Sequence, residues 1–232
     1  IILGHPENLA SIPKDTVMLT WGYSARPSFT DQILPFKDSG YDFFVCPGVS
    51  CWSRILPDFQ TANVNIRNFL RDGVENGAMG MINTAWDDDG ETLGAPNWHG
   101  FLWGAECAWN GGTTSIDDFN RRVGAVFFGE KGDHFGQAVS LLTGVHGLAG
   151  FGGMFNGRFW EVDTARCSVS EAVIRTQADA LLKRVTPALD HLRALKREAR
   201  CNTHAIDALL FGTKRMDLIG RRMTSILDIS RA

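Results

Sequence analysis

The sequence predicts an α/β fold in which a short parallel sheet is followed by helices. Three apolar runs, 16–20, 41–46 and 79–85, have the length and residue types of buried strands. Their apolar residues are continuous rather than alternating, which is typical of parallel strands covered on both faces. Helical periodicity lies between the runs, so the order is strand, helix, strand, with right-handed crossovers.

Local signals support each element of this sheet. The first run follows Pro13 and Asp15, a turn signal, and the second stops at Pro47. Between the second and third runs, apolar residues recur at helical spacing from 66 to 74, and Gly77 stands where a C-terminal cap is expected. Segment 31–38 is the helix candidate between the first two runs, although it contains Pro35.

Two architectures fit this order, a slice of a (β/α)8 barrel or part of a doubly wound sheet. Polar and aromatic residues gather just after the strands, where barrel active sites are built. Neither a GxGxxG nor a GxxxxGK[ST] segment follows a strand, which argues against nucleotide binding. We therefore predict about three β/α units from the C-terminal part of a TIM barrel over 1–112, followed by an α-helical extension over 113–232.

The predicted extension contains three helices. Ser115 and Asp118 form a capping-box pattern at the start of a helix that reaches about residue 128. Apolar periodicity marks two longer helices, over 174–192 and 206–227, and the short connection between them predicts an antiparallel hairpin. Residues 193–222 hold eight Lys or Arg against three acidic residues, a pattern that we interpret as a solvated helix face rather than an anion-binding one.

Composition excludes several classes of protein. With 44% hydrophobic and 21% charged residues over 232 positions, the chain is neither disordered nor of low complexity. A net charge of -3 argues against a nucleic-acid partner, and no apolar run approaches the roughly 18 residues of a membrane span, so no membrane partner is expected. The first residue is not Met and the helical pattern runs to the last residue, so we expect a fragment of a longer chain.

Neither the cysteine nor the histidine residues predict a metal site or a cofactor. The five Cys show no CxxC pair and no Cys/His cluster at zinc spacing, so they are expected to be free, mostly buried thiols. The six His are scattered without an HExxH segment, and no GxSxG nucleophile elbow is present.

Aromatic residues at the strand ends are the first functional signal. Trp21 and Tyr23 follow the first strand, Trp52 the second and Trp86 the third. Aromatic rings beside polar groups suit carbohydrate, because the apolar face of a sugar packs on a ring. Core packing is the alternative for each of them. Three Trp in the next segment are expected to be packing residues: Trp98, Trp103 and Trp109.

The acidic segment after Trp86 is the second signal. It has four carboxylates within five residues, 87–91, which repel one another unless they are solvated, paired or bound to something. A solvated loop is one interpretation, and an acceptor for sugar hydroxyls beside a stacking Trp is the other. The spacing lacks the alternating ligands of a calcium-binding EF-hand loop.

These segments together resemble glycoside hydrolase family 20, the β-N-acetylhexosaminidases. The matching stretches are 5–23, which ends in Leu-Thr-Trp-Gly-Tyr, 83–90, which reads Asn-Thr-Ala-Trp-Asp-Asp-Asp-Gly, and 103–110, which reads Trp-Gly-Ala-Glu-Cys-Ala-Trp-Asn. The resemblance covers roughly residues 1 to 130 and implies the C-terminal half of a catalytic barrel. The helical remainder resembles a C-terminal extension of some bacterial members.

The resemblance gives roles to some residues. The family ends its last strand in Trp-x-Glu, where the Trp walls the sugar pocket and the carboxylate holds distal hydroxyls; in this sequence Trp86 and Asp88 match, with Asp in place of Glu. The family also binds the substrate's acetamido group with a Tyr after strand seven. The corresponding stretch 46–52 has no Tyr, and Tyr23 is the substitute that we expect.

The family's catalytic pair is not matched in this sequence. Family 20 enzymes carry adjacent Asp-Glu in a His-x-Gly-Gly-Asp-Glu context, in which Glu is the general acid and Asp orients the acetamido oxygen that attacks the anomeric carbon. The resemblance implies that this pair lies upstream of Ile1, in the N-terminal half of the barrel, and that this chain alone is inactive. The implied substrate is a terminal N-acetylhexosamine of a glycan, and no residue of this sequence is assigned a catalytic role.

Two other functions stay open from the sequence. A carbohydrate-binding relative without catalysis would lack the acid pair altogether, and a structural α/β module would bury its aromatic residues in the core. Solvent exposure of Trp21, Trp52 and Trp86 separates the last from the others. Only the resemblance bears on the compartment, and it points to a bacterial periplasmic or secreted protein.

Overall fold

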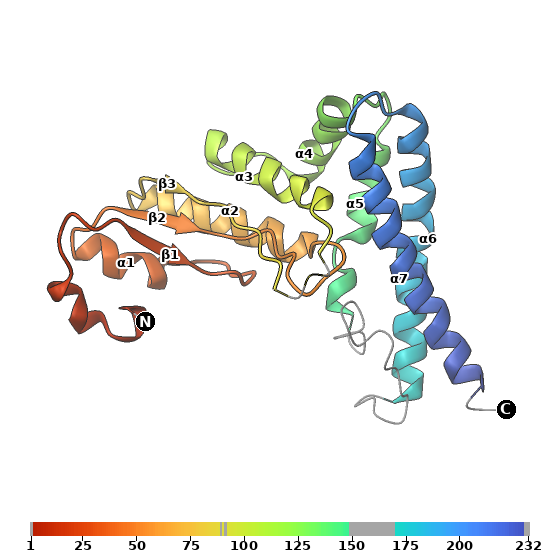
Figure 1. The fold of residues 1–232 in the computed structure, drawn as a ribbon, viewed down its shortest axis with the longest axis horizontal. Coiled ribbons are helices and arrows are strands. Elements are labelled where there is room, and N and C mark those ends of the chain that lie inside the picture. Colours follow the sequence, from red (N-terminus) through yellow and green to blue (C-terminus); the bar gives the residue numbers. More distant parts are fainter. Residues whose placement is uncertain (1, 89, 91, 149–169, 230–232) are drawn as a thin grey trace. The chain divides into compact units, whose positions relative to one another are not determined.

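The computed structural model describes residues 2–88, 90, 92–148 and 170–229, with the side chains of 226 and 229 excepted (Figure 1). Their contacts divide the chain into two compact units. The sheet unit comprises Ile1–Ser50, Gln60–Trp86 and His99–Ser115, and the helical unit comprises Cys51–Phe59, Asp87–Trp98 and Ile116–Ala232. The predicted domains are continuous in sequence, whereas the helical unit takes in two loops from the first half of the chain, 51–59 and 87–98.

The sheet unit contains three parallel strands in sequence order. They are β1 (Met18–Trp21), β2 (Phe43–Cys46) and β3 (Gly80–Met81), and the sheet order is β1-β2-β3. The predicted α/β class and the predicted adjacent parallel strands are confirmed. β3 is shorter than the run 79–85, because Pro47 follows β2 and has no N–H for the ladder. Pairing resumes beyond it at the bridge between Gly48 and Thr84.

Two helices connect the strands, α1 (Thr30–Asp38) and α2 (Phe59–Glu75), as the periodicity predicts. α2 packs closely on β2, since a Cβ added to Gly73 would lie 2.8 Å from Cγ1 of Val45. The chain leaves α2 at Gly77, whose φ is +83°, and the N–H of Ala78 donates to the carbonyl of Gly73 (2.9 Å). This hydrogen-bond pattern is the glycine C-cap that the sequence predicts.

One face of β1 differs from its prediction. Met18 and Thr20 are buried, but Leu19 is 54% exposed and Trp21 is 64% exposed. The continuous apolar run predicted cover on both faces, and for β1 that prediction is wrong within the described residues. Successive side chains of a strand point to opposite faces, so the alternation identifies one covered face and one face open to solvent.

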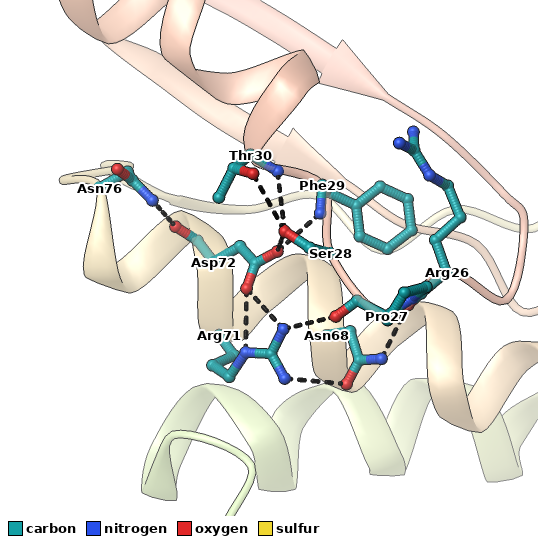
Figure 2. A network of polar contacts seen from close by, with 9 residues as sticks. All are labelled: Arg26, Pro27, Ser28, Phe29, Thr30, Asn68, Arg71, Asp72 and Asn76. Atoms are coloured by element: carbon teal, nitrogen blue, oxygen red, sulfur yellow. Dashed lines mark hydrogen bonds and ion pairs between the residues drawn. The ribbon is translucent and has the colours of Figure 1, made fainter.

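A buried carboxylate ties the loop before α1 to α2 (Figure 2). Asp72 of α2 is 2% exposed and accepts hydrogen bonds from the Phe29 backbone N–H (2.6 Å) and the Ser28 hydroxyl (2.8 Å). Arg71 donates to the same carboxylate (2.7 and 2.9 Å) and to the Pro27 carbonyl (2.7 Å). Because Phe29 is the N-cap residue of α1, a side chain of α2 satisfies a backbone donor at the start of α1.

The helical unit is built around a long antiparallel hairpin. Helix α6 (Glu171–Glu198) and helix α7 (Thr203–Ile229) run side by side in opposite directions, which confirms the predicted hairpin (Figure 1). They approach closely at Gly220, where an added Cβ would lie 2.9 Å from Cγ of Leu182. No helix in the described part of the chain has an apolar stretch long enough to cross a lipid bilayer.

The remaining helices are shorter. The helix predicted from Ser115 is α4 (Ile116–Val123), and its last part is a π-helix, η4 (Gly124–Phe128), rather than an α-helix. Helix α5 (His134–Leu142) is not among the predicted elements, and α3 (Trp98–Asn110) follows β3. Short 3-10 turns are η1 (Ile2–Gly4), η2 (Pro6–Ser11), η3 (Ala95–Asn97) and η5 (Val145–Gly147).

Two sequence-based expectations about side chains are only partly correct. Trp103 is a packing residue, 1% exposed, with its indole N–H donating to the Asn63 carbonyl (3.0 Å). Trp98 and Trp109, however, are 49% and 92% exposed, so the packing prediction is wrong for Trp109, which lies on the solvent side of α3. Three cysteines are buried free thiols (Cys46, Cys51, Cys107), Cys201 is exposed, and Cys167 lies outside the described residues.

Candidate functional site

The carboxyl ends of the three strands meet at one edge of the sheet, as they must in a parallel sheet. Hydrogen bonds continue the ladder past the strands at this edge. Gly22 donates to the Cys46 carbonyl (3.4 Å), Val49 donates to the Thr84 carbonyl (2.9 Å), and the Thr84 N–H donates to the Pro47 carbonyl (2.9 Å). The loops that follow β1, β2 and β3 therefore all begin at the same hydrogen-bonded edge of the sheet.

Three predicted site residues of the sheet unit lie together at this edge. The Trp21 and Tyr23 rings stack, with centroids 5.4 Å apart and an angle of 27° between the planes. The indole N–H of Trp86 donates to the Tyr23 hydroxyl oxygen (2.8 Å). We call Trp21, Tyr23 and Trp86 the aromatic cluster.

The indole faces of the aromatic cluster reach solvent. Trp21 is 64% exposed and Trp86 is 49% exposed, whereas Tyr23 between them is half-buried. Core residues of this size are normally covered, so core packing does not account for the two Trp. Flat apolar faces bordered by a phenol and an indole N–H suit a ligand with both C–H and hydroxyl groups.

A glycine makes room for the Tyr23 ring. A Cβ added to Gly48 would lie 2.9 Å from Cδ1 of Tyr23 and 3.1 Å from Oγ1 of Thr84. That space is too small for a side chain, so the ring lies directly on the backbone after β2. The Thr84 hydroxyl is itself held, because it donates to the Pro47 carbonyl (2.9 Å).

Asn65 of α2 holds the loops beneath the aromatic cluster, and the sequence did not indicate it. This fully buried amide accepts a hydrogen bond from the Gly48 N–H (3.0 Å). It donates to the carbonyls of Gly22 (2.8 Å) and Ser24 (3.0 Å). The one available signal was an Asn beside Ile66 on the apolar face of a helix, where a buried amide needs partners of its own.

The other two predicted site residues, Trp52 and Asp88, belong to the helical unit. Trp52 is half-buried and its carbonyl accepts a hydrogen bond from Arg54 (3.0 Å), while Asp88 is exposed. Within the acidic segment, Asp87 is also exposed and positions 89 and 91 lie outside the described residues. That Asp88 faces the same cavity as Trp86 stays a prediction.

A half-buried histidine, whose Nε2 atom is shielded from solvent, anchors the loop that carries Trp52. His146 hydrogen-bonds the backbone of Leu56 and Pro57, the residues where this loop enters α2. Burial lowers the pKa of His146 to about 4, and the Asp58 charge, which acts in the opposite direction, does not offset it. The imidazole is therefore neutral at physiological pH and serves as a structural group.

The thiols of Cys46 and Cys107 are not prepared for nucleophilic chemistry. Burial raises the pKa of Cys46, which lies on β2, and raises the pKa of Cys107 on α3 to about 12. Thiolates are the reactive form, so neither group is a nucleophile at neutral pH. Over residues 2–88, 90, 92–148 and 170–229, no three His, Cys, Asp or Glu side chains gather into a metal site.

Replacing Gly48 by alanine should displace Tyr23, because the new methyl group and the ring cannot occupy the same space. We expect a loss of about 1–3 kcal/mol in the free energy of unfolding, as for other overpacked sites. The shift in tryptophan emission that accompanies loss of the Trp86–Tyr23 hydrogen bond should appear as well. The matched control is Gly4→Ala, since an added Cβ at Gly4 meets nothing within 4 Å. Equal effects of the two substitutions would contradict the packing argument.

Comparison with known proteins adds no assignment to this geometry. No protein-family model matches the sequence, and a search of curated proteins finds no significant match.

Proposed function

We propose that the aromatic cluster is one wall of a sugar-binding pocket in an exo-β-N-acetylhexosaminidase that resembles glycoside hydrolase family 20. The observation that carries this proposal is the pair of solvent-exposed indoles, Trp21 and Trp86, held against Tyr23 at the carboxyl edge of a parallel sheet. Sugar-binding enzymes use such rings to pack the C–H face of a pyranose. The same edge is where barrel enzymes build their active sites.

We also propose a more specific fold for the sheet unit, namely part of a TIM barrel. Over the described residues the sheet ends at β1 on one side and β3 on the other, with apolar side chains exposed on Leu19, Trp21 and Ile82. A closed barrel pairs both edges and fills its interior with side chains from all strands. The exposed face of β1 is explained if it belongs to such an interior.

In the proposed enzyme, the residues of the aromatic cluster bind and orient the substrate. Other residues cleave the glycosidic bond. Trp21 and Trp86 supply the stacking faces, and the Trp86 N–H fixes the position of the Tyr23 phenol for the acetamido group. Trp52 and Asp88 are further pocket residues by resemblance. The Asp-Glu pair of substrate-assisted retention would come from the preceding part of the polypeptide, so residues 1–232 alone should not hydrolyse an aryl N-acetylglucosaminide.

Tryptophan fluorescence titrated with a β-1,4-linked N-acetylglucosamine oligosaccharide tests the binding wall. We expect a saturable change with millimolar affinity, weakened about tenfold by Trp86→Ala, since an aromatic contact contributes roughly 0.5–1.5 kcal/mol beyond its buried area. Trp109→Ala is the matched control, because this Trp is 92% exposed and belongs to α3 rather than the aromatic cluster. If Trp109→Ala weakens binding as much as Trp86→Ala, the assignment of the wall is wrong.

The neighbouring carboxylates Asp87 and Asp88 give a second test, in the polypeptide that also carries the acid pair. Residues two apart in an extended chain share a face, so Asp88 should face the sugar with Trp86 while Asp87 points away. Asp88→Ala should lower kcat/KM at least about tenfold, because a hydrogen bond to a charged acceptor is worth roughly 1.5–3 kcal/mol. Asp87→Ala should do much less. An equal or larger effect at Asp87 would exclude Asp88 as the sugar-holding carboxylate.

A non-catalytic carbohydrate-binding relative is the second candidate, and the same aromatic cluster supports it. The two functions differ in the preceding polypeptide, where only the enzyme requires an acidic pair on a strand end. Hydrolysis of an aryl N-acetylglucosaminide by the longer protein, abolished by substituting that pair, would select the enzyme. Sugar binding without turnover would select the binding protein.

A further inference from the structure

A pair of histidines in the helical unit has no role in the sugar-binding proposal. His134 is the first residue of α5 and His191 lies on α6, and their Nδ1 atoms are 3.2 Å apart. Both residues are half-buried, so solvent reaches the pair. The two positions are 57 residues apart in the sequence, so this pair forms only when the chain is folded.

The backbone that carries His134 is held at the start of α5. Glu130 is 5% exposed, and its carboxylate accepts hydrogen bonds from the backbone N–H groups of His134 (3.0 Å) and Phe135 (3.1 Å). A carboxylate in this position satisfies two of the donors that the first turn of a helix leaves unpaired. Because α5 also packs along α6, the His134 ring has a defined position opposite His191.

A carboxylate faces the other ring nitrogen of His134. Oε1 of Glu198, near the end of α6, lies 3.5 Å from Nε2 of His134. Histidines that ligate a metal usually direct their other ring N–H to a carboxylate, which fixes the orientation and the tautomer of the ring. With its Nε2–H directed to Glu198, neutral His134 has its lone pair on Nδ1, the atom that faces His191.

We propose that His134 and His191 bind one divalent transition-metal ion through their Nδ1 atoms, with Glu198 as a positioning residue. Bonds from zinc to imidazole nitrogen are about 2.0–2.1 Å long, so two such ligands are about 2.9 Å apart at a right angle and about 3.3 Å apart at the tetrahedral angle. The observed separation of 3.2 Å lies between these values. Imidazole is a ligand that suits zinc, copper and nickel.

The pair also has a metal-free state. The same separation suits a hydrogen bond with one proton between the two Nδ1 atoms. A bound metal takes the place of this proton, which moves to Nε2 of His191, and both rings are then neutral. Since no three His, Cys, Asp or Glu side chains of the described chain form a metal-binding group, water completes the coordination. We therefore expect weaker binding than at a structural zinc site with four protein ligands.

Isothermal titration calorimetry with zinc chloride at pH 7.5 tests this site. The titrations use a background with Cys167→Ser and Cys201→Ser, because thiolates are also zinc ligands. We expect saturable binding of one ion per chain, weakened at least about tenfold by His191→Gln, because even residues that only orient a ligand contribute 10–100-fold to metal affinity. The matched control is His204→Gln, at an exposed histidine of α7, which should leave the zinc affinity unchanged.

A second pair of variants tests the role of Glu198. Glu198→Gln should weaken zinc binding about tenfold, as the loss of an orienting carboxylate does. Asp190→Asn, at an exposed carboxylate of the same helix, removes the same charge and should have little effect on the affinity. Without zinc, the two variants should have the same midpoint of thermal unfolding. Zinc should raise this midpoint in the background protein but not in His191→Gln, because a ligand that binds the folded state stabilises it.

These measurements are independent of sugar binding, which the aromatic cluster of the sheet unit is proposed to perform. The absence of saturable binding at millimolar zinc would overturn the proposal. So would zinc binding that persists unchanged in both His134→Gln and His191→Gln, or that is lost equally in His204→Gln. Equal effects of Glu198→Gln and Asp190→Asn would contradict the positioning role of Glu198.

Discussion

Asp72→Ala should destabilise the sheet unit by about 2–3 kcal/mol, because the buried Phe29 N–H and the half-buried Ser28 hydroxyl lose a charged acceptor. Arg71 is partly exposed and can turn to water, so its contribution is left out of that figure. The measurement is the free energy of unfolding from urea denaturation. Asp38→Ala, at an exposed carboxylate on α1, is the control and should change stability by no more than about 0.5 kcal/mol.

Because of Asp72, the free energy of unfolding should also depend on pH under acidic conditions. Burial pushes the pKa of Asp72 upward, but hydrogen bonds from Phe29, Arg71 and Ser28 and the Arg71 charge bring this pKa below the ordinary value of 3.8. A carboxylate whose pKa is lower in the folded chain stabilises the fold above its unfolded pKa, and this stabilisation is lost as pH falls through the folded value. A stability difference between wild type and Asp72→Ala that persists unchanged to pH 2 would contradict this account.

His146 should make the helical unit sensitive to mild acid. The unfolded chain takes up a proton near pH 6.5, whereas the folded imidazole, with a pKa of about 4, does not. Between these values the unfolded state binds more protons, so the free energy of unfolding falls as pH decreases from 6.5 to 4 and levels off below 4. The loss is about 3 kcal/mol, since one pKa unit corresponds to roughly 1.4 kcal/mol.

The variant His146→Gln isolates this effect. A glutamine amide can still donate to the Leu56 and Pro57 backbone but does not titrate. Stability measured by urea denaturation at pH 7, 5.5 and 4 should therefore fall more steeply for wild type than for His146→Gln. The other histidines and the carboxylates are present in both proteins and cancel in the comparison. Parallel pH profiles would show that His146 does not cause the acid sensitivity.

The sequence by itself determined the three strands, the two helices between them and the C-terminal helical hairpin, together with their order. Apolar runs around Leu19, Phe44 and Met81 predict parallel strands in sequence order, and the glycine at 77 predicts the end of α2; the structure confirms both. The antiparallel hairpin of α6 and α7 was also predictable. These features depend on residues within a few positions of one another, where periodicity, caps and turn residues act directly on the backbone.

Only the tertiary structure decided which side chains meet and which face solvent. The sequence proposed Trp21, Tyr23 and Trp86 as site residues, but the hydrogen bond from Trp86 to Tyr23 joins positions 63 apart in the chain. Asn65 and Asp72 likewise act on loops more than 40 residues away. Exposure of β1 on one face and of Trp109 on α3 depends on which neighbours cover an element, and an apolar residue has the same sequence signal whether it is covered or not. Burial and contacts between distant residues are properties of the assembled fold, and local pattern does not contain them.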